Sequence, residues 1–276
     1  KKLFLLDALA LIYRAHFAFS KNPRINSKGL NTGVMLGFTN TLLEILEKEK
    51  PSHIAVVFDT SAPTFRHKQF EAYKANRQEQ PEDISIGIPW VKQIVKAFNI
   101  PTLELNGYEA DDIIGTLAKQ AEKSCYTVYM MTPDKDYGQL VDDHIFLYKP
   151  AFMGNAVDVM GPKEICEKWD IENVDQVRDI LGLMGDAVDN IPGIPGIGAK
   201  TAVKLLKQFG SIEELVKNTD KLKGKQKENV EKYGEQGILS KELATIIQDV
   251  PIEYHADDFT VEPPDEENLK ALFAEL

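Results

Sequence analysis

The sequence predicts an α/β protein in which a mainly parallel central sheet is flanked by helices and followed by a helical part. Short Val-, Ile- and Leu-rich segments alternate with amphipathic helical patterns up to about residue 160. Such alternation implies right-handed crossovers between parallel strands. Beyond Gly161-Pro162 the pattern is all helical. We therefore expect two domains, residues 1–161 and 162–276.

The expected strands are short and apolar, and several of them end in an acidic residue. Strands are expected at residues 3–6, 53–58, 101–105, 127–132 and 145–148, and helices at residues 8–19, 34–48, 86–98, from 109 onward, and at 177–184, 200–209 and 212–217. The carboxyl ends of parallel strands meet at one edge of a sheet, where ligand sites form. Acids that follow these strands should therefore lie close together.

Composition narrows the class of protein. With 276 residues, 43% hydrophobic and 27% charged, the chain is ordinary for a globular protein. Its formal charge of −11 argues against a protein that coats nucleic acid, although charge distribution matters more than the total. Cys125 and Cys166 show no zinc or disulfide spacing. Without an apolar run of about 20 residues or a signal peptide, we expect a cytoplasmic location and no membrane partner. The missing initiator Met suggests a fragment.

Nine carboxylates on five short segments are expected at the same edge of the sheet. They are Asp7, Asp59, Glu109, Asp111, Asp112, Asp134, Asp136, Asp186 and Asp189. Acids in the first turn of a helix are also favoured by the helix dipole, so residues 109–112 alone could mark only a well-started helix. Together, the nine charges repel one another unless a cation binds. Divalent metal is the natural counter-charge.

A basic insert at about residues 62–84 interrupts the acidic chain. Between Phe65 and Arg77 there are two Arg, two Lys and one His against a single Glu, interleaved with aromatic residues. This mixture suits phosphates and bases together, although a solvated helix is the alternative. Lys74 and Arg77 lie three residues apart and would share one face of a helix.

A Gly-rich segment, Gly193 to Thr201, fits neither common phosphate loop. Ala199 stands where a P-loop needs Lys, and Thr201 stands where a dinucleotide fingerprint needs its third Gly. What remains is a hairpin between two helices, whose free N–H groups can hold a nucleic-acid phosphate. From residue 196 to 232 there are nine lysines against five acids, so bases and acids are segregated along the chain.

These motifs occur in a characteristic order. They are Leu6-Asp7 with Tyr13-Arg14, Val57-Phe58-Asp59, Phe65-Arg66 through Tyr73-Lys74-Ala75-Asn76-Arg77, Glu109-Ala110-Asp111-Asp112, Asp134-Lys135-Asp136, and Leu183-Met184-Gly185-Asp186 through Asp189-Asn190-Ile191-Pro192-Gly193. The chain resembles, nearly end to end, the 5′ nuclease domain of bacterial DNA polymerase I, within the flap endonuclease family. Ala8 and Pro133 depart from the family pattern, and neither departure removes a carboxylate.

The resemblance implies a metal-dependent nuclease with a PIN-like sheet, a helical arch and a helix-hairpin-helix. Two Mg²⁺ or Mn²⁺ ions would be held by these acids. The ligands of one ion would be Asp7, Asp59, Asp111 and, through water, Glu109, and those of the other would be Asp134, Asp136 and Asp189. Asp111 would lie between the two ions, and Asp112 and Asp186 would lie nearby. Two such metals can drive in-line phosphodiester hydrolysis. Lys74, Arg77 and Arg14 would draw in the phosphate, and Tyr13 would stack on a displaced base. The alternative for Tyr13 and Arg14 is that they belong to ordinary helix surface.

The resemblance also implies the partners. DNA contacts are expected from Arg66, Lys68, Tyr73, Gly193, Gly196, Gly198, Lys200, Thr201 and Lys204. The hairpin at residues 190–204 would hold K⁺ as well. The substrate would be DNA with a 5′ flap, nick or 5′ end, met in primer removal and repair. The domain would act as a monomer in the nucleoid-associated part of the cytoplasm, with polymerase domains following it in the chain.

Two other functions stay open. A catalytically silent DNA-junction binder would have no evident reason to keep nine converging carboxylates. A PIN-type ribonuclease or small-molecule phosphatase would share the acidic sheet edge, but it would need neither the basic insert nor the hairpin.

Overall fold

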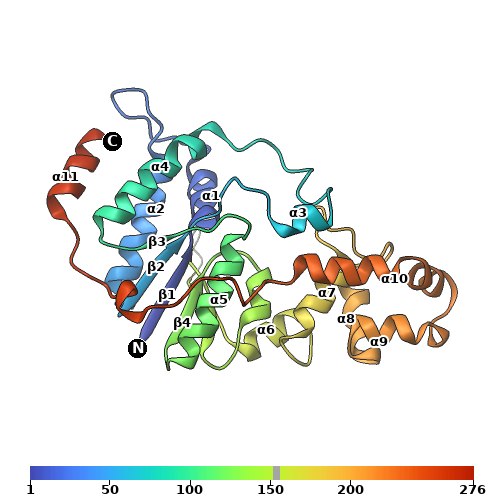
Figure 1. Cartoon of the computed structure of the whole chain (residues 1–276). Coiled ribbons are helices and arrows are strands. Elements are labelled where there is room, and N and C mark those ends of the chain that lie inside the picture. Colours follow the sequence, from blue (N-terminus) through green and yellow to red (C-terminus); the bar gives the residue numbers. More distant parts are fainter. Residues whose placement is uncertain (152–155) are drawn as a thin grey trace.

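The sheet has six strands, and the predicted α/β architecture is confirmed. The computed structural model describes residues 1–151 and 156–276. Across the sheet the strand order is β3-β2-β1-β4-β5-β6, and Figure 1 labels β3, β2, β1 and β4 in this order. The strands are β1 (Lys2–Asp7), β2 (His53–Val57), β3 (Thr102–Leu103), β4 (Thr127–Met131), β5 (Ile145–Lys149) and β6 (Asp158–Met160). The first five pair in parallel and β6 pairs with β5 in the antiparallel sense, so five carboxyl ends lie at one edge.

Helices cover both faces of this sheet. Those of the α/β part are α1 (Ala8–Phe19), α2 (Gly33–Glu44), the π-helical turn η1 (Ile45–Glu49), α4 (Glu82–Ala97) and α5 (Ala110–Lys123). Phe4 and Leu6 of β1 pack with α1, α2 and α4, whereas Leu3 and Leu5 pack with α5. Side chains of a strand alternate between faces, and both faces are covered, so β1 is buried from Leu3 onward and Leu3 to Leu6 form a continuous apolar run.

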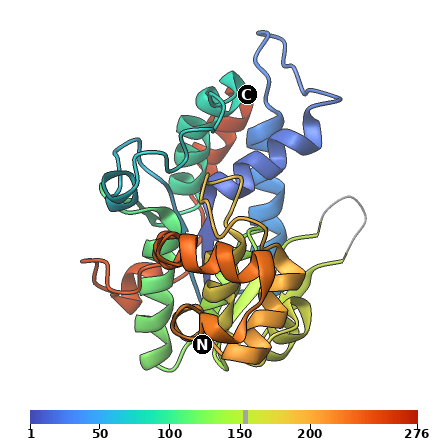
Figure 2. The ribbon, with the colours of Figure 1, turned by 90° about the vertical axis from the view of Figure 1, so that its right-hand side faces the viewer.

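The second part of the chain is a helical lobe (Figure 2). Its helices are α6 (Pro162–Trp169), α7 (Gln176–Met184), α8 (Ala199–Phe209), α9 (Ile212–Lys217) and α10 (Gly224–Ala244), with the short 3-10 turn η3 (Thr219–Lys221). The sequence predicts α7, α8 and α9 nearly to the residue but misses α10. Glycines rather than large apolar residues fill part of the buried face of α10, and a Cβ at Gly237 would lie 2.7 Å from Ile194. Close glycine contacts leave no apolar stripe in the sequence.

The C-terminal segment returns to the α/β part, which the sequence did not predict. It includes the 3-10 turn η4 (Ala256–Phe259) and helix α11 (Glu266–Glu275). Leu269 and Leu272 are buried in the core formed by α1, α2 and α4. The backbone N–H of Asp265 donates to the carbonyl of Ala97 at 2.8 Å. Figure 1 shows α11 lying beside α4, far from the helical lobe.

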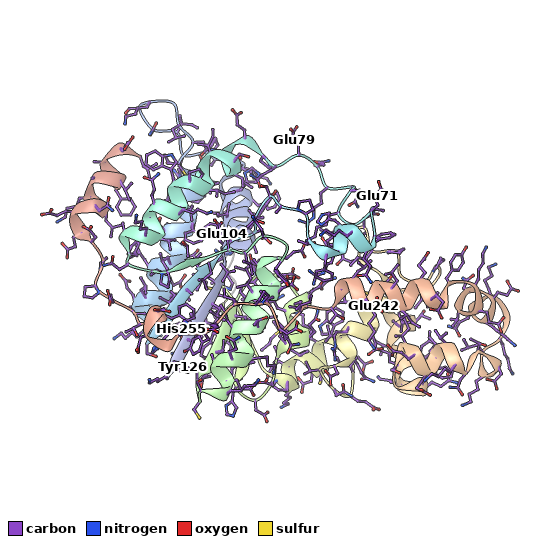
Figure 3. All side chains as sticks on the ribbon, in the orientation of Figure 1. Glu71, Glu79, Glu104, Tyr126, Glu242 and His255 are labelled. Atoms are coloured by element: carbon purple, nitrogen blue, oxygen red, sulfur yellow. The ribbon has the colours of Figure 1, made fainter. Side chains whose placement is uncertain are left out.

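The basic insert differs from a continuous helical arch. It holds one short helix, α3 (Phe65–Gln69), followed by turns over residues 71–76 and an extended stretch to α4. Gln69 donates to the carboxylate of Glu242 on α10 at 2.8 Å, so the insert lies against the helical lobe (Figure 3). Lys74 has a φ of 56°, which ends helical geometry there. Lys74 and Arg77 therefore do not share a helical face, contrary to the expectation from their spacing.

One further short helix, the 3-10 helix η2 (Asp136–Leu140), follows β4. Within the described ranges no helix is both long and apolar enough to cross a membrane.

Candidate metal centre

Asp7 ends β1, and its carboxylate is buried beneath the sheet edge. Its Oδ1 accepts a hydrogen bond from the backbone N–H of Ala10 at 3.1 Å, which caps α1. Its Oδ2 accepts hydrogen bonds from the hydroxyl groups of Tyr137 at 3.0 Å and Thr132 at 3.2 Å. Burial, and then the charge of Asp59, raises the pKa of Asp7 to about 7. A neighbouring cation would relieve the cost of ionising this carboxylate.

The start of α5 brings further acids to the same edge. Glu109 is the N-cap of α5, and Asp111 and Asp112 lie in its first turn. Asp59 follows β2 and accepts a hydrogen bond from the backbone N–H of Ala110 at 2.9 Å, which holds the two segments together. Burial, and then the charges of Asp112 and Glu109, raises the pKa of Asp111 well above its usual range.

A second group of acids lies after β4 and after α7. Asp134 accepts a hydrogen bond from the backbone N–H of Asp136 at 2.9 Å. Oδ1 of Asp136 is buried and has no hydrogen-bond partner among the described residues. Burial, and then the charge of Asp134, raises the pKa of Asp136 to about 8. A buried carboxylate oxygen without a donor is a fitting ligand for a hard cation.

The loop after α7 adds Asp186 and Asp189. Oδ1 of Asp186 accepts hydrogen bonds from the backbone N–H groups of Val188 at 2.7 Å and Asp189 at 3.3 Å. These hydrogen bonds close a turn over residues 186–189, which fixes the backbone of the loop that carries both acids.

Eight of the nine predicted acids line two adjoining clefts. The larger has a volume of about 1770 Å³, and among its walls are Asp7, Tyr13, Arg14, Asp59, Lys74, Arg77, Glu109, Asp111, Asp134 and Asp189. The smaller, of about 590 Å³, is lined by residues that include Arg77, Asp134, Asp136, Asp186, Asp189 and Gly198. The ninth acid, Asp112, lines neither cleft.

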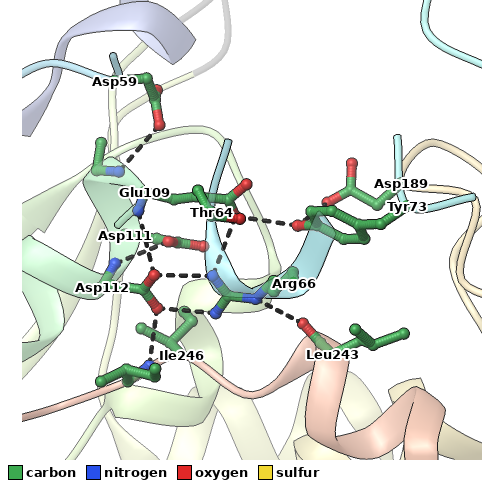
Figure 4. A network of polar contacts seen from close by, with 12 residues as sticks. Asp59, Thr64, Arg66, Tyr73, Glu109, Asp111, Asp112, Asp189, Leu243 and Ile246 are labelled. Atoms are coloured by element: carbon green, nitrogen blue, oxygen red, sulfur yellow. Dashed lines mark hydrogen bonds and ion pairs between the residues drawn. The ribbon is translucent and has the colours of Figure 1, made fainter. Parts of the chain in front are cut away.

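Two side chains of the insert bridge acids from opposite sides of the larger cleft. The ammonium of Lys74 lies 2.6 Å from Oε1 of Glu109 and 3.7 Å from Oδ2 of Asp189. The Tyr73 hydroxyl donates to Glu109 at 3.0 Å and lies 3.4 Å from Asp189, between the two acids (Figure 4). Arg77 pairs with Asp189 at 2.5 Å. Burial alone would lower the pKa of Lys74, but the charges of Glu109 and Asp189 raise it.

These bridges change two expectations. Tyr73 is 3% exposed, so its hydroxyl serves Glu109 rather than contacting DNA as the sequence suggested. Within residues 1–151 and 156–276, no three Asp, Glu, His or Cys side chains form a ready-made metal site. Part of the acid charge is instead neutralised by Lys74 and Arg77.

Arg66 and Asp112 form a buried ion pair, which corrects both of their expected roles. Arg66 is 1% exposed and Asp112 is fully buried, so neither can reach DNA or a cleft. Both oxygens of Asp112 accept from the guanidinium of Arg66, at 2.7 and 2.8 Å, in the paired geometry of Figure 4. The guanidinium also donates to the carbonyls of Leu243 at 2.9 Å and Thr245 at 2.8 Å, and to Glu109 at 3.3 Å. Burial opposes the charge of Arg66, but the hydrogen bonds to Asp112 and the charges of the neighbouring acids raise its pKa above the usual range.

The hairpin at residues 190–204 is partly internal. Gly193 is buried, its N–H donates to the Ser240 hydroxyl at 3.0 Å, and its carbonyl accepts from Gln236 at 2.8 Å. Its φ is 61°, and a Cβ there would lie 2.4 Å from the backbone nitrogen of Gly185. Gly193 therefore serves the close approach of two backbone segments, which corrects its expected DNA contact. Of the other expected DNA contacts, Lys68, Gly196, Gly198, Lys200 and Lys204 are exposed and Thr201 is half-buried.

Tyr13 and Arg14 line the larger cleft from α1, as expected. Both are half-buried. Arg14 donates to the hydroxyl of Thr41 at 3.0 Å and to the carbonyl of Ala151. Burial lowers the pKa of the Arg14 guanidinium.

Sequence reasoning missed three residues at this site. Tyr137 and Thr132 hold Asp7, and Lys149 at the end of β5 lines the larger cleft. Proximity to Asp134 and Asp136 in the sequence was the only available signal for Thr132 and Tyr137. Lys149 has no motif around it.

Two family models match the chain. The model described as 5'-3' exonuclease, N-terminal resolvase-like domain, covers residues 2–170, and the model described as 5'-3' exonuclease, C-terminal SAM fold, covers residues 172–267. The chain belongs to the 5′–3′ exonuclease family. The predicted enzyme class, 5′–3′ exonuclease, is thereby confirmed.

Relatives of this 5′–3′ exonuclease agree with that assignment. DNA polymerase I of Bacillus caldotenax is 42% identical over the whole chain, which spans 31% of that relative's length. A 5'-3' exonuclease of Aquifex aeolicus is 37% identical, with 100% of this chain and 92% of the relative covered. A flap endonuclease of bacteriophage T5, solved with DNA and metal ions, shares the fold at a TM-score of 0.70 and 22% identity, over 88% of this chain and 89% of that one. The chain therefore matches about a third of the polymerase.

Proposed function

We propose that this 5′–3′ exonuclease is a structure-selective nuclease that hydrolyses phosphodiester bonds at 5′ ends and 5′ flaps of DNA with the help of Mg²⁺ or Mn²⁺. The observation that carries the proposal is the pair of adjoining clefts, lined by eight of the nine predicted acids together with Lys74, Arg77 and Arg14. Acids alone would repel DNA, and cations alone would not hold a metal. The T5 relative solved with DNA and metal ions supports the proposal.

The donor set fits hard divalent cations. All candidate ligands are carboxylates, the ligand type that Mg²⁺ and Mn²⁺ prefer. Asp7, Asp59, Asp111 and Glu109 would serve one ion, and Asp134, Asp136 and Asp189 the other, with Asp186 shaping the loop. When bound, the two ions supply Lewis-acid chemistry, activating water and stabilising charge on the phosphodiester.

The chain's own cations handle the phosphate. Lys74 and Arg77 already point at acids of the cleft, so they lie where a scissile phosphate would enter. If Glu109 and Asp189 were neutralised by bound metal in place of Lys74 and Arg77, both cations would become available to a phosphate oxygen. Arg14 adds positive charge from α1, and Tyr13 offers a ring face for a displaced base.

The hairpin would hold the duplex. Gly196 and Gly198 are exposed at the start of α8, where helix N–H groups attract phosphate, and Lys200 and Lys204 are exposed on the same helix. We assign the K⁺ site to the backbone of this hairpin. Primer removal and repair, a monomeric state and attached polymerase domains are proposed by analogy with DNA polymerase I relatives.

The test is a cleavage assay with three substrates. A labelled 5′-flap duplex, a matched blunt duplex and a hairpin RNA are incubated with Mg²⁺ or with EDTA. Metal-dependent cutting of the flap duplex well above the RNA supports the proposal. Binding without cutting would indicate a silent junction binder, and preferential cutting of RNA would indicate a PIN-type ribonuclease.

A further inference from the structure

The carboxylate of Asp112 is saturated with hydrogen bonds. Oδ1 accepts from Arg66 at 2.8 Å and from the backbone N–H of Ile247 at 2.9 Å. Oδ2 accepts from Arg66 at 2.7 Å and from the backbone N–H of Glu109 at 3.2 Å. An ionised carboxylate offers about four acceptor positions, and all four are in use. Asp112 has nothing left to offer a metal.

Arg66 joins three separate parts of the chain. It belongs to the insert, it pairs with Asp112 and contacts Glu109 at the start of α5, and it donates to the carbonyls of Leu243 and Thr245 at the end of α10. A planar guanidinium with five donors suits such a junction, and an ammonium could not reproduce it.

Helix α10, whose C-terminal end contacts Arg66, also contacts the hairpin at residues 190–204. Asn229 donates to the carbonyl of Pro195 at 2.8 Å, and Gln236 donates to that of Gly193 at 2.8 Å. Asp186 and Asp189 precede the same hairpin, so α10 is connected to the second group of acids. Arg66 thus connects the start of α5, which carries Glu109 and Asp111, to the helix that holds the hairpin after Asp186 and Asp189.

We propose that the Arg66–Asp112 pair is a positioning device that fixes the two halves of the metal centre relative to each other, with Asp112 supporting Glu109 rather than binding metal. The inference rests on the proposed metal-dependent function. Partners that orient metal ligands contribute strongly to metal affinity, and their loss costs about 10- to 100-fold.

The experiment measures Mn²⁺ binding by calorimetry without DNA, in wild type, Arg66→Lys, Asp112→Asn and the control Arg178→Lys. Arg178 forms a solvent-accessible pair with Asp175 at 2.7 Å and lines neither cleft, so its change repeats the Arg-to-Lys chemistry outside the metal centre. We expect Arg66→Lys and Asp112→Asn to weaken Mn²⁺ binding by a similar factor of about 10 to 100, and to lower kcat on a 5′-flap substrate more than they raise KM. The control should bind as wild type does.

A second measurement does not depend on the folding of a variant. The guanidinium protons of Arg66 are followed by NMR in the wild-type protein during a Mg²⁺ titration. Slow solvent exchange that persists at saturating Mg²⁺ supports the inference.

Three results would overturn it. They are faster exchange of the Arg66 protons on adding Mg²⁺, Mn²⁺ binding lost in Asp112→Asn but kept in Arg66→Lys, and normal Mn²⁺ binding in both variants. A wild-type protein that neither binds Mn²⁺ nor cuts DNA would instead overturn the proposed function itself, and the inference with it.

Discussion

The ammonium of Lys74 lies 2.6 Å from Oε1 of Glu109, so the insert brings a cation directly onto an acid of the candidate metal centre. The backbone of Lys74 is left-handed, with a φ of 56°. The backbone N–H of Lys74 also donates to the carbonyl of Asp189 at 2.9 Å. The position of Lys74 is therefore fixed by both its backbone and its side chain.

Lys74→Ala should slow the chemical step far more than it weakens DNA binding. If Lys74 meets the phosphate mainly in the transition state, its loss lowers kcat with little change in KM. We expect a single-turnover rate about 100-fold lower at saturating enzyme on a 5′-flap substrate, comparable to the loss of one stabilising donor. Lys68→Ala, at an exposed position on α3, is the matched control and should reduce only the salt dependence of binding, by about one counterion. A normal rate at saturating enzyme would make Lys74 a simple anchor.

Asp111→Asn should abolish cleavage while DNA binding persists. The change removes one charge at nearly constant volume from a carboxyl whose pKa is raised by burial and by Asp112 and Glu109. Less repulsion should therefore leave the melting temperature in EDTA equal to or above that of wild type. Cleavage assays, DNA binding in Ca²⁺ and thermal melts test these three expectations together. Full activity would remove Asp111 from the mechanism.

Gly198→Val should weaken duplex binding and leave the fold intact. A Cβ at Gly198 meets nothing within 4 Å, and its φ of −93° suits any residue. The added side chain would obstruct the approach of a phosphate to the start of α8. Gly193→Ala is the contrasting variant, because its φ of 61° and its contact with Gly185 predict a loss of about 1–3 kcal/mol in stability. Filter binding and thermal melts separate the two effects, and a lowered melt for Gly198→Val would contradict this assignment.

The acids of the cleft predict an unusual dependence on pH. Asp7 and Asp136 have pKa values of about 7 and about 8 in the folded chain, above the unfolded value of 3.8. The folded state then binds more protons than the unfolded state, so stability without metal is lost as the pH rises through about 7 and 8. Metal binding needs the deprotonated acids and should stabilise more at high pH. Thermal melts at about pH 6 and about pH 8.5, with EDTA or Mg²⁺, test both trends. A melting temperature in EDTA that rises between these values would contradict the first.

The α/β part was predictable because its signals are local. The helix expected at residues 8–19 is α1 itself, since its apolar spacing is visible in the sequence. Parallel strands force their carboxyl ends to one edge, so eight acids could be placed in the clefts from strand ends and motifs alone. Missing from the expected strands was β6, the edge strand that pairs with β5 in the antiparallel sense.

The rest could not be predicted because it depends on contacts between distant segments. Asp112 and Asp111 look alike in the sequence, and only the return of residues 243–247 to α5 decides that Asp112 faces Arg66. Tyr73 and Gly193 lie in motifs that predict DNA contacts, but both residues are buried in the structure. A motif shows that a residue is needed without showing what it touches.

The placement of α11 has a consequence for folding during synthesis. Asn26 donates to the carbonyl of Leu276 at 2.6 Å, a contact between residues 250 positions apart, and Leu269 and Leu272 bury part of α4. Contacts of such long range form late, because a long loop must close first. A nascent chain that ends before residue 265 should therefore leave apolar surface on α4 exposed. Limited proteolysis of ribosome-bound chains of increasing length should show α4 becoming protected only once α11 has emerged.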